Sequence, residues 1–215
     1  MKKGERETDR LDNANSQLGV ELWRVKSGLD IYRVIALNKT SIKSGKAFFG
    51  FVQNQSLASV ALGLAKVFER EEAHELCSIR GVYRLAKQVE IRDIEAATVF
   101  VGKYGISASG DWIRDIDKVF SRHRPRFQSH MKKIDKVRNT RLAHIQQYAP
   151  AAVLPSIAAF DDLLGFAFDF HSFVNEAFLS ESSHPILDDK RIETSLLNLL
   201  RKTGVSDPVR GDYGR

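Results

Sequence analysis

Residues 136–147, KVRNTRLAHIQQ, carry side chains whose types and spacing could support chemistry on a phosphate group. In a helix, Arg138 and His144 would be separated by about 240° of rotation and about 9 Å of rise, so they would flank a shallow surface wide enough for a phosphate. Arg141 lies between them in the sequence. A histidine can donate or accept a proton near neutral pH, and an arginine offers a fixed positive fork to phosphate oxygens. This stretch is therefore the first candidate for a functional site.

The same residues also have structural interpretations. A single histidine on a helix is more often structural than catalytic, Arg138 could pair with an acid one turn earlier, and Asn139 could bond locally to the backbone. The chain holds a second Arg-to-His spacing of the same length, from Arg124 to His130, in which Pro125 follows the arginine and opposes a helix. We interpret the second spacing as a coincidence.

The distribution of charge indicates a polyanionic partner. The chain has 33 lysine and arginine residues, 27 aspartate and glutamate residues, and a formal net charge of +6. Nine of the basic residues fall between Lys118 and His144, where Asp135 is the only acid. Such a stripe suits a nucleic acid, and a solvated helix face is the alternative. The residues expected to contact a phosphate backbone are Arg126, Lys132, Lys133, Lys136 and Arg141.

Other common kinds of site are missing from the sequence. Cys77 is the only cysteine, which excludes a disulfide framework within the chain and fits a reducing cytoplasm. There is no His-x-x-x-His pair for zinc, no glycine-rich phosphate loop and no nucleophile elbow. The first residues are too polar for a signal peptide, and no run of 18 apolar residues is available for a membrane span. We therefore expect a cytoplasmic protein with no metal, no cofactor and no membrane contact.

Helices are expected along most of the chain. Apolar residues recur at spacings of three and four, and no segment alternates with the period of two that strands show. The predicted helices cover residues 14–38, 44–70, 78–100, 111–122, 126–147, 155–179 and a last segment that runs from a cap at Asp188 and Asp189 to near Gly204. The second is apolar on more than one face, which predicts a central position in the core. Pro125 is expected to break or kink the chain between the fourth and fifth helices.

The elements predict an all-α helical bundle of roughly five to seven helices. We expect a polar N-terminal segment over residues 1–13, a single helical domain over 14–204 and a flexible C-terminal tail over 205–215.

Several polar and aromatic residues outside the first candidate stretch also have expected roles. Ser109 or Asp111 is a plausible N-cap for the fourth helix, and Asp161 and Asp162 are interpreted as helix-start carboxylates. Trp23 and Trp112 are expected to anchor the core or an interface. His123 and His130 are expected either to contact a nucleic-acid backbone or to be solvated.

The run Arg138-Asn139-Thr140-Arg141-Leu142-Ala143-His144 resembles the signature of the HEPN superfamily. That signature is an arginine, a polar residue that is often asparagine, and a histidine after four to six intervening positions; here five intervene. The stretch VRNTRLAH is most similar to HEPN proteins of bacterial abortive-infection and toxin–antitoxin systems. The resemblance is close over residues 134–145 and loose over 45–200. It implies a helical bundle, frequent dimerisation and often metal-independent endoribonuclease activity.

RNA carries its own nucleophile, the 2′-hydroxyl, beside the scissile phosphate, so cleavage needs a base, an acid and a cation. The resemblance gives His144 the role of general acid/base and Arg138 the stabilisation of phosphate charge. Asn139 would orient the phosphate or His144, and Arg141 would assist RNA binding. Because one histidine cannot be base and acid in the same step, we expect a homodimer with two Arg138–His144 sets in one cleft.

Two other functions remain open from the sequence. One is a non-catalytic helical module that binds RNA or a protein partner through the same basic face. The other is a structural subunit whose basic stripe meets an acidic partner, such as an antitoxin or another protein of an antiviral defence system.

Overall fold

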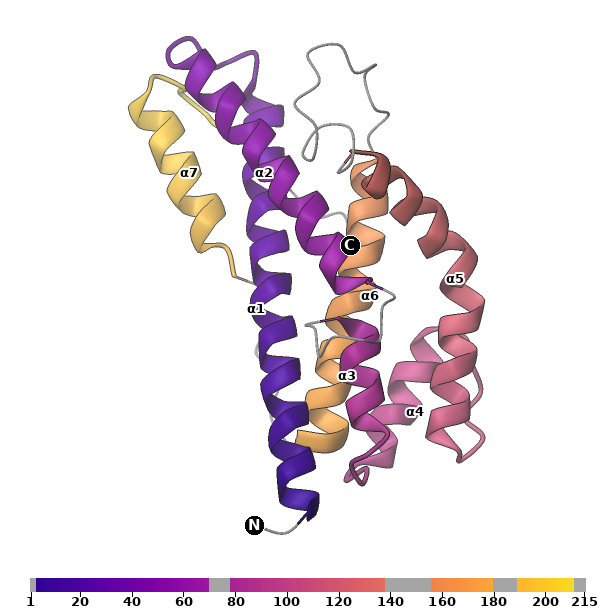
Figure 1. Ribbon diagram of the computed structural model, residues 1–215. Coiled ribbons are helices and arrows are strands. Elements are labelled where there is room, and N and C mark those ends of the chain that lie inside the picture. The colour runs from indigo at the N-terminus through magenta and orange to yellow at the C-terminus, as the bar shows by residue number, and fades with distance from the viewer. Residues whose placement is uncertain (1–2, 70–77, 138–155, 180–188, 211–215) are drawn as a thin grey trace.

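The computed structural model describes residues 3–69, 78–137, 156–179 and 189–210. In these residues the chain forms seven α-helices, one π-helical turn and no strand. The elements are α1 (Lys3–Asn38), α2 (Lys46–Val67), α3 (Ile79–Ala86), α4 (Ile94–Lys103), α5 (Trp112–Val137), α6 (Ile157–Val174), η2 (Asn175–Leu179) and α7 (Arg191–Lys202). The predicted all-α bundle is therefore confirmed (Figure 1).

Helix α1 is the long axis of the bundle. Its 36 residues span about 54 Å, and α2, α3, α6 and α7 all pack against it (Figure 1). It begins at Lys3 rather than near residue 14, because Leu11 is fully buried and extends the apolar stripe of Leu18 toward the N-terminus. None of the described helices combines the length and apolar character needed to cross a membrane.

Helices α1 and α2 approach closely because glycines leave room between them. A methyl group at Gly63 would lie 2.4 Å from Val25 Cγ2, which is closer than two carbon atoms can pack. The opposite face of α2 is uncovered, with the Phe48 and Phe51 side chains 57% and 62% exposed. The predicted central position is confirmed for the inner face of α2, whose Val60 and Leu64 are fully buried in the core, whereas the face with Phe48 and Phe51 lies outside it.

The helix predicted over residues 78–100 is two helices. Ser78 caps α3 through its side-chain oxygen, and the Asp93 carboxylate caps α4 by accepting the Glu95 N–H at 2.8 Å. Between them the chain contacts η2, where the Asp93 N–H donates to the Ala177 carbonyl at 3.1 Å. The two caps satisfy helix ends that a single continuous helix would not have.

Aromatic rings fill the space between α3, α4, α5 and α6. Phe100 stacks on Phe173 with ring centroids 5.0 Å apart, and Phe127 packs on Phe166 at 4.6 Å. Trp112, at the start of α5, lies edge-on against Phe178 and Tyr83, so its predicted role as a core anchor is confirmed.

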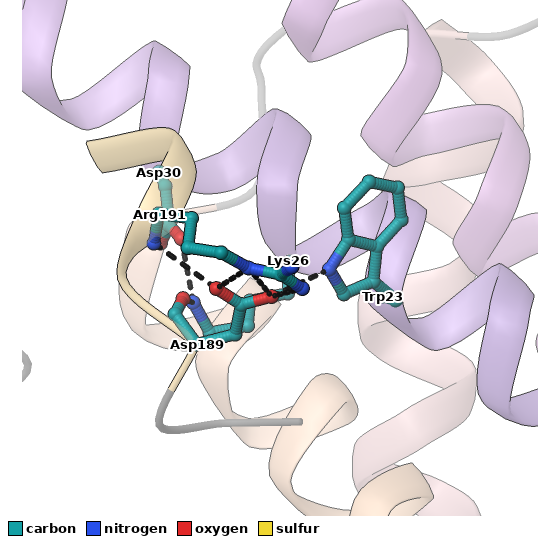
Figure 2. A network of polar contacts seen from close by, with 5 residues as sticks. All are labelled: Trp23, Lys26, Asp30, Asp189 and Arg191. Atoms are coloured by element: carbon teal, nitrogen blue, oxygen red, sulfur yellow. Dashed lines mark hydrogen bonds and ion pairs between the residues drawn. The ribbon is translucent and has the colours of Figure 1, made fainter. Parts of the chain in front are cut away.

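A network of hydrogen bonds and ion pairs around Asp189 connects α7 to α1 (Figure 2). The buried Lys26 ammonium donates to the Asp30 carboxylate at 2.7 Å and to the Asp189 carbonyl at 2.6 Å. The Asp189 carboxylate accepts hydrogen bonds from Trp23 Nε1 at 3.1 Å and from the Arg191 guanidinium at 2.7 Å. The bond from Arg191 holds the pKa of Asp189 well below its ordinary range. Asp189 also accepts the Arg191 N–H at 3.0 Å, but the N-cap position of α7 is Lys190, so the predicted cap at Asp189 is wrong by one residue.

An apolar cluster and a glycine complete the description of α7 and of its two ends. Asp188, the other predicted cap, lies outside the described residues. An apolar cluster completes the docking of α7, and its members include Val34, Ile35, Leu197 and Leu200. Helix α7 ends at Lys202, two residues before Gly204, whose φ of +94° suits glycine and agrees with the predicted end.

Candidate nucleic-acid interface

Helix α5 carries seven of the nine clustered basic residues, from Lys118 to Lys136, and a polar cap fixes its start. The Arg114 N–H donates to Asp111 Oδ1 at 3.1 Å, which confirms Asp111 as one of the two predicted N-caps. One turn further, the Asp115 carboxylate accepts from the Lys118 ammonium at 2.7 Å and from Ser109, and these donors lower its pKa to about 2. Its negative charge also suits the positive end of the helix dipole.

Pro125 lies inside α5 and does not end it. The helix runs without interruption from Trp112 to Val137, so the predicted separation into two helices is wrong. Pro125 is exposed, and its ring therefore removes a backbone hydrogen bond on the solvent side, where water can replace it. The ribbon of α5 leans toward α6 in its second half (Figure 1).

Four of the five predicted RNA-binding residues lie on described parts of α5. Arg126, Lys132, Lys133 and Lys136 all have exposed side chains. The buried Ile134 is on the inner side of the same helix, so packing against the core turns the lysines outward. The fifth residue, Arg141, lies outside the described residues.

Arg126 and His130 also have a structural partner on α6. Arg126 Nε lies 2.6 Å from Asp162 Oδ2, and His130 Nε2 lies 3.5 Å from the same oxygen. Both basic side chains sit one turn apart on α5, so a single carboxylate can face both. Asp162 therefore ties α6 to α5. No sequence signal near residue 162 indicates this partner, because the contact depends on how two helices pack.

The prediction that Asp161 and Asp162 start a helix is wrong. Helix α6 begins at Ile157 and is capped by the Ser156 hydroxyl oxygen, which accepts the Ala159 N–H at 3.2 Å. Asp161 instead pairs with the Arg33 guanidinium of α1. The two neighbouring carboxylates thus connect α6 to two different helices.

His123 packs against aromatic rings and is half-buried. Its ring lies edge-on to Tyr104, with centroids 5.1 Å apart, and is nearly parallel to Phe127 at 5.7 Å. Burial lowers the pKa of His123, and the charge of Arg126 adds to that effect. A neutral ring against aromatic neighbours is suited to packing, so the expectation that His123 is solvated or touches a nucleic-acid backbone is wrong.

The central residues of the predicted site are not part of the described structure. Arg138, Asn139 and His144 fall between Val137, the last residue of α5, and Ser156, the cap of α6. The described structure therefore places only the approach to this segment, which is the basic second half of α5. Among the residues that are described, no group of three or more His, Cys, Asp or Glu side chains comes together as a metal site.

A comparison with known protein families shows which family the chain belongs to. The model of one family, HEPN_AbiU2, described as AbiU2, matches residues 2–186. This chain belongs to the AbiU2 family of HEPN proteins. The matched residues include α1 to α6 of this AbiU2-family protein together with the run from Arg138 to His144, and α7 follows them. The family relationship makes the chain an abortive-infection-associated HEPN domain. No curated protein and no solved structure matches it.

Proposed function

We propose that this AbiU2-family protein is a metal-independent endoribonuclease of a bacterial defence or toxin–antitoxin system. One observation carries the proposal: α5, with Lys132 and Lys133 exposed, leads directly into the Arg138–His144 run, and the family match includes that run. Cations along a helix attract the phosphate backbone, and the residues at its end have the types that phosphate cleavage requires.

The proposed reaction uses the 2′-hydroxyl of the RNA as nucleophile. Its oxygen forms a bond to phosphorus while the bond from phosphorus to the 5′ oxygen breaks, giving a 2′,3′-cyclic phosphate and a 5′-hydroxyl end. His144 of one copy takes the proton from the 2′-hydroxyl, and the protonated His144 of a second copy gives one to the leaving oxygen. Arg138 stabilises the charge that develops on the phosphate oxygens, and Asn139 orients the phosphate or the imidazole.

The test of activity compares two RNA oligonucleotides in the presence of EDTA. The purified protein should cut an all-ribose strand, and it should leave intact the same strand with a 2′-deoxy nucleotide at the cleavage position. Cleavage that stops in EDTA and returns with added Mg²⁺ would contradict the metal-independent reaction.

The proposed homodimer follows from the need for two proton-transfer groups of one kind. Light scattering on the active protein should give a mass of at least twice 24.3 kDa. Cleavage by a protein that remains monomeric at the assay concentration would rule out the two-histidine reaction.

A second candidate function is a non-catalytic module that binds RNA or a protein partner such as an antitoxin. The exposed lysines of α5 favour it, because they can hold a polyanion without any catalytic group. A salt-sensitive shift in RNA mobility without any cleavage would support this function over the nuclease.

A further inference from the structure

The outer face of α2 carries a regular stripe of exposed residues. They recur at spacings of three and four, within about 80° of rotation on one side of the helix: Phe48, Phe51, Gln55, Ser59, Leu62 and Lys66. Leu62 is 41% exposed, and Phe48 and Phe51 are more exposed still. Apolar residues at this spacing form the side of a helix that packs against another helix. The inner side of α2 already has its neighbours in the core, so the outer stripe is a second packing surface.

The stripe lies on a helix segment without charge. Helix α2 has no charged residue between Lys46 and Lys66, in a chain in which 28% of the residues are charged, so its outer face differs from an ordinary solvated helix face. Exposed aromatic residues and missing charges are the composition of the centre of a protein–protein interface. The missing charge also favours a second copy as the partner. Two chains of net charge +6 repel each other, and they meet with the least repulsion where neither carries a charge.

The stripe is self-complementary under a two-fold axis through Gln55. If two α2 helices pack antiparallel about this axis, Phe48 of each copy lies opposite Leu62 of the other, and Phe51 lies opposite Ser59. A large side chain thus faces a small one next to the axis, as interdigitating helices require. The Gln55 amide meets the same amide of the second copy, and an amide can both donate and accept a hydrogen bond. The lysines at the two ends of α2 fall at the rim, where salt screens their charge.

We propose that this stripe, the outer seam of α2, is the surface by which two copies of the protein form a dimer, with their α2 helices antiparallel. The inference deepens the proposed function by naming where the second copy binds, and it rests on that function only for the need of a second copy.

The position of the axis fits the proposed two-copy reaction. Phe68, at the end of α2, packs on Phe127 of α5 with ring centroids 5.6 Å apart, and α5 then rises about 15 Å to Val137. Helix α2 runs in the opposite direction and covers the same length in about ten residues (Figure 1). Helix α5 therefore ends level with the middle of α2, near Gln55. An axis through Gln55 puts the ends of the two α5 helices at one level of the dimer rather than at its opposite ends.

Sedimentation equilibrium on the full chain tests the surface by measuring the dissociation constant of the dimer. Phe51→Glu puts a carboxylate of each copy into the contact, where it loses water, and should raise the dissociation constant at least about 100-fold. Circular dichroism should be that of the wild type, because Phe51 is exposed in the single chain. The control is Val99→Glu on α4, an equally exposed apolar residue away from the seam, which should change the dissociation constant less than about twofold.

Cross-linking tests the antiparallel arrangement. Cys77 is the only cysteine of the chain, so Cys77→Ser gives a background without thiols. In that background Gln55→Cys should form a disulfide between two copies under mild oxidation, because the axis brings the two residues within reach of each other. Phe48→Cys should not, because the antiparallel arrangement separates the two residues by about 20 Å. A cross-link in Phe48→Cys without one in Gln55→Cys would overturn the antiparallel seam.

The outcomes separate this inference from the nuclease. A wild type that stays monomeric, or a Phe51→Glu variant that stays dimeric, would overturn the seam even if the wild type cleaves RNA. A dimer that Phe51→Glu separates, and that never cleaves RNA, would support the seam and contradict the nuclease. A monomeric Phe51→Glu that cleaves RNA at the wild-type rate would support the seam and contradict the two-histidine reaction.

Discussion

Asp162 lies within ion-pair distance of Arg126 and His130 on α5, and Asp161 beside it pairs with Arg33 of α1. At the scale of single residues, the sequence shows which side chains are acidic or basic, but it does not show which side chains they contact. The basic residues of α5 could be recognised because they are close together in the chain, and the spacing from Arg138 to His144 is equally local. The partners of Asp161 and Asp162 could not, since each pair joins helices that are distant in sequence and depends on how they pack.

His171 gives the protein a predictable sensitivity to acid. It is buried in α6, and burial lowers its pKa from 6.5 to about 4. The unfolded chain therefore binds a proton more readily than the folded one. Its contribution to stability is present above about pH 6.5 and is lost as the pH falls toward 4.

Urea unfolding at pH 7.5 and pH 4.5 tests this effect. The free energy of unfolding of the wild type should fall when the pH is lowered from 7.5 to 4.5. In His171→Leu this fall should be smaller by about 2–3 kcal/mol. His123 also has a lowered pKa but is present in both proteins, so the difference isolates His171. An equal loss in both would show that His171 does not carry the effect.

At the scale of elements, two boundaries show where local patterns fail. Pro125 predicts a break or a kink, and the break does not occur: α5 continues through Pro125, which is exposed, so that water can replace the lost backbone hydrogen bond. The apolar spacing over residues 78–100 predicts one helix, yet Asp93 starts a second one and η2 binds the connecting backbone. Both outcomes depend on the tertiary surroundings, whereas the longer regular helices followed from periodicity alone.

The close approach of α1 and α2 leads to a prediction for Gly63. In Gly63→Ala, the new methyl group would meet Val25 Cγ2 at 2.4 Å, and the two helices must move apart. The free energy of unfolding should fall by about 1–3 kcal/mol. The control is Gly165→Ala in α6, where nothing lies within 4 Å of the new methyl group; it should be neutral or stabilising by up to about 1 kcal/mol. Equal effects of the two substitutions would contradict the close packing.

The attachment of α7 depends on the buried ammonium of Lys26. Lys26→Ala removes the donor to Asp30 and to the Asp189 carbonyl, and it leaves a buried carboxylate without its cation. It should cost about 3–5 kcal/mol of stability. Arg24→Ala, which removes an arginine that is 63% exposed and paired with Glu21, should cost less than about 1 kcal/mol. A loss below about 1 kcal/mol for Lys26→Ala would show that the network does not hold α7.

At the scale of the whole molecule, the periodicity of apolar residues was enough to predict an all-α bundle, and the structure confirms it. The arrangement of its helices was not predictable, because it depends on contacts such as Gly63 with Val25 and Lys26 with Asp189. The family relationship, likewise, was indicated by the run from Arg138 to His144 and is shown by the match over residues 2–186.

The most direct test compares RNA cleavage by the wild type, His144→Ala and His130→Ala in EDTA. The two histidines end the two Arg-to-His spacings of equal length in this chain, so His130 is a matched internal control. His144→Ala should fold as the wild type does and should lower the cleavage rate by about 10²–10⁴-fold, the usual contribution of a general acid or base. His130→Ala should cut at nearly the wild-type rate. Cleavage that survives in His144→Ala, or that is lost in His130→Ala alone, would contradict the role of His144.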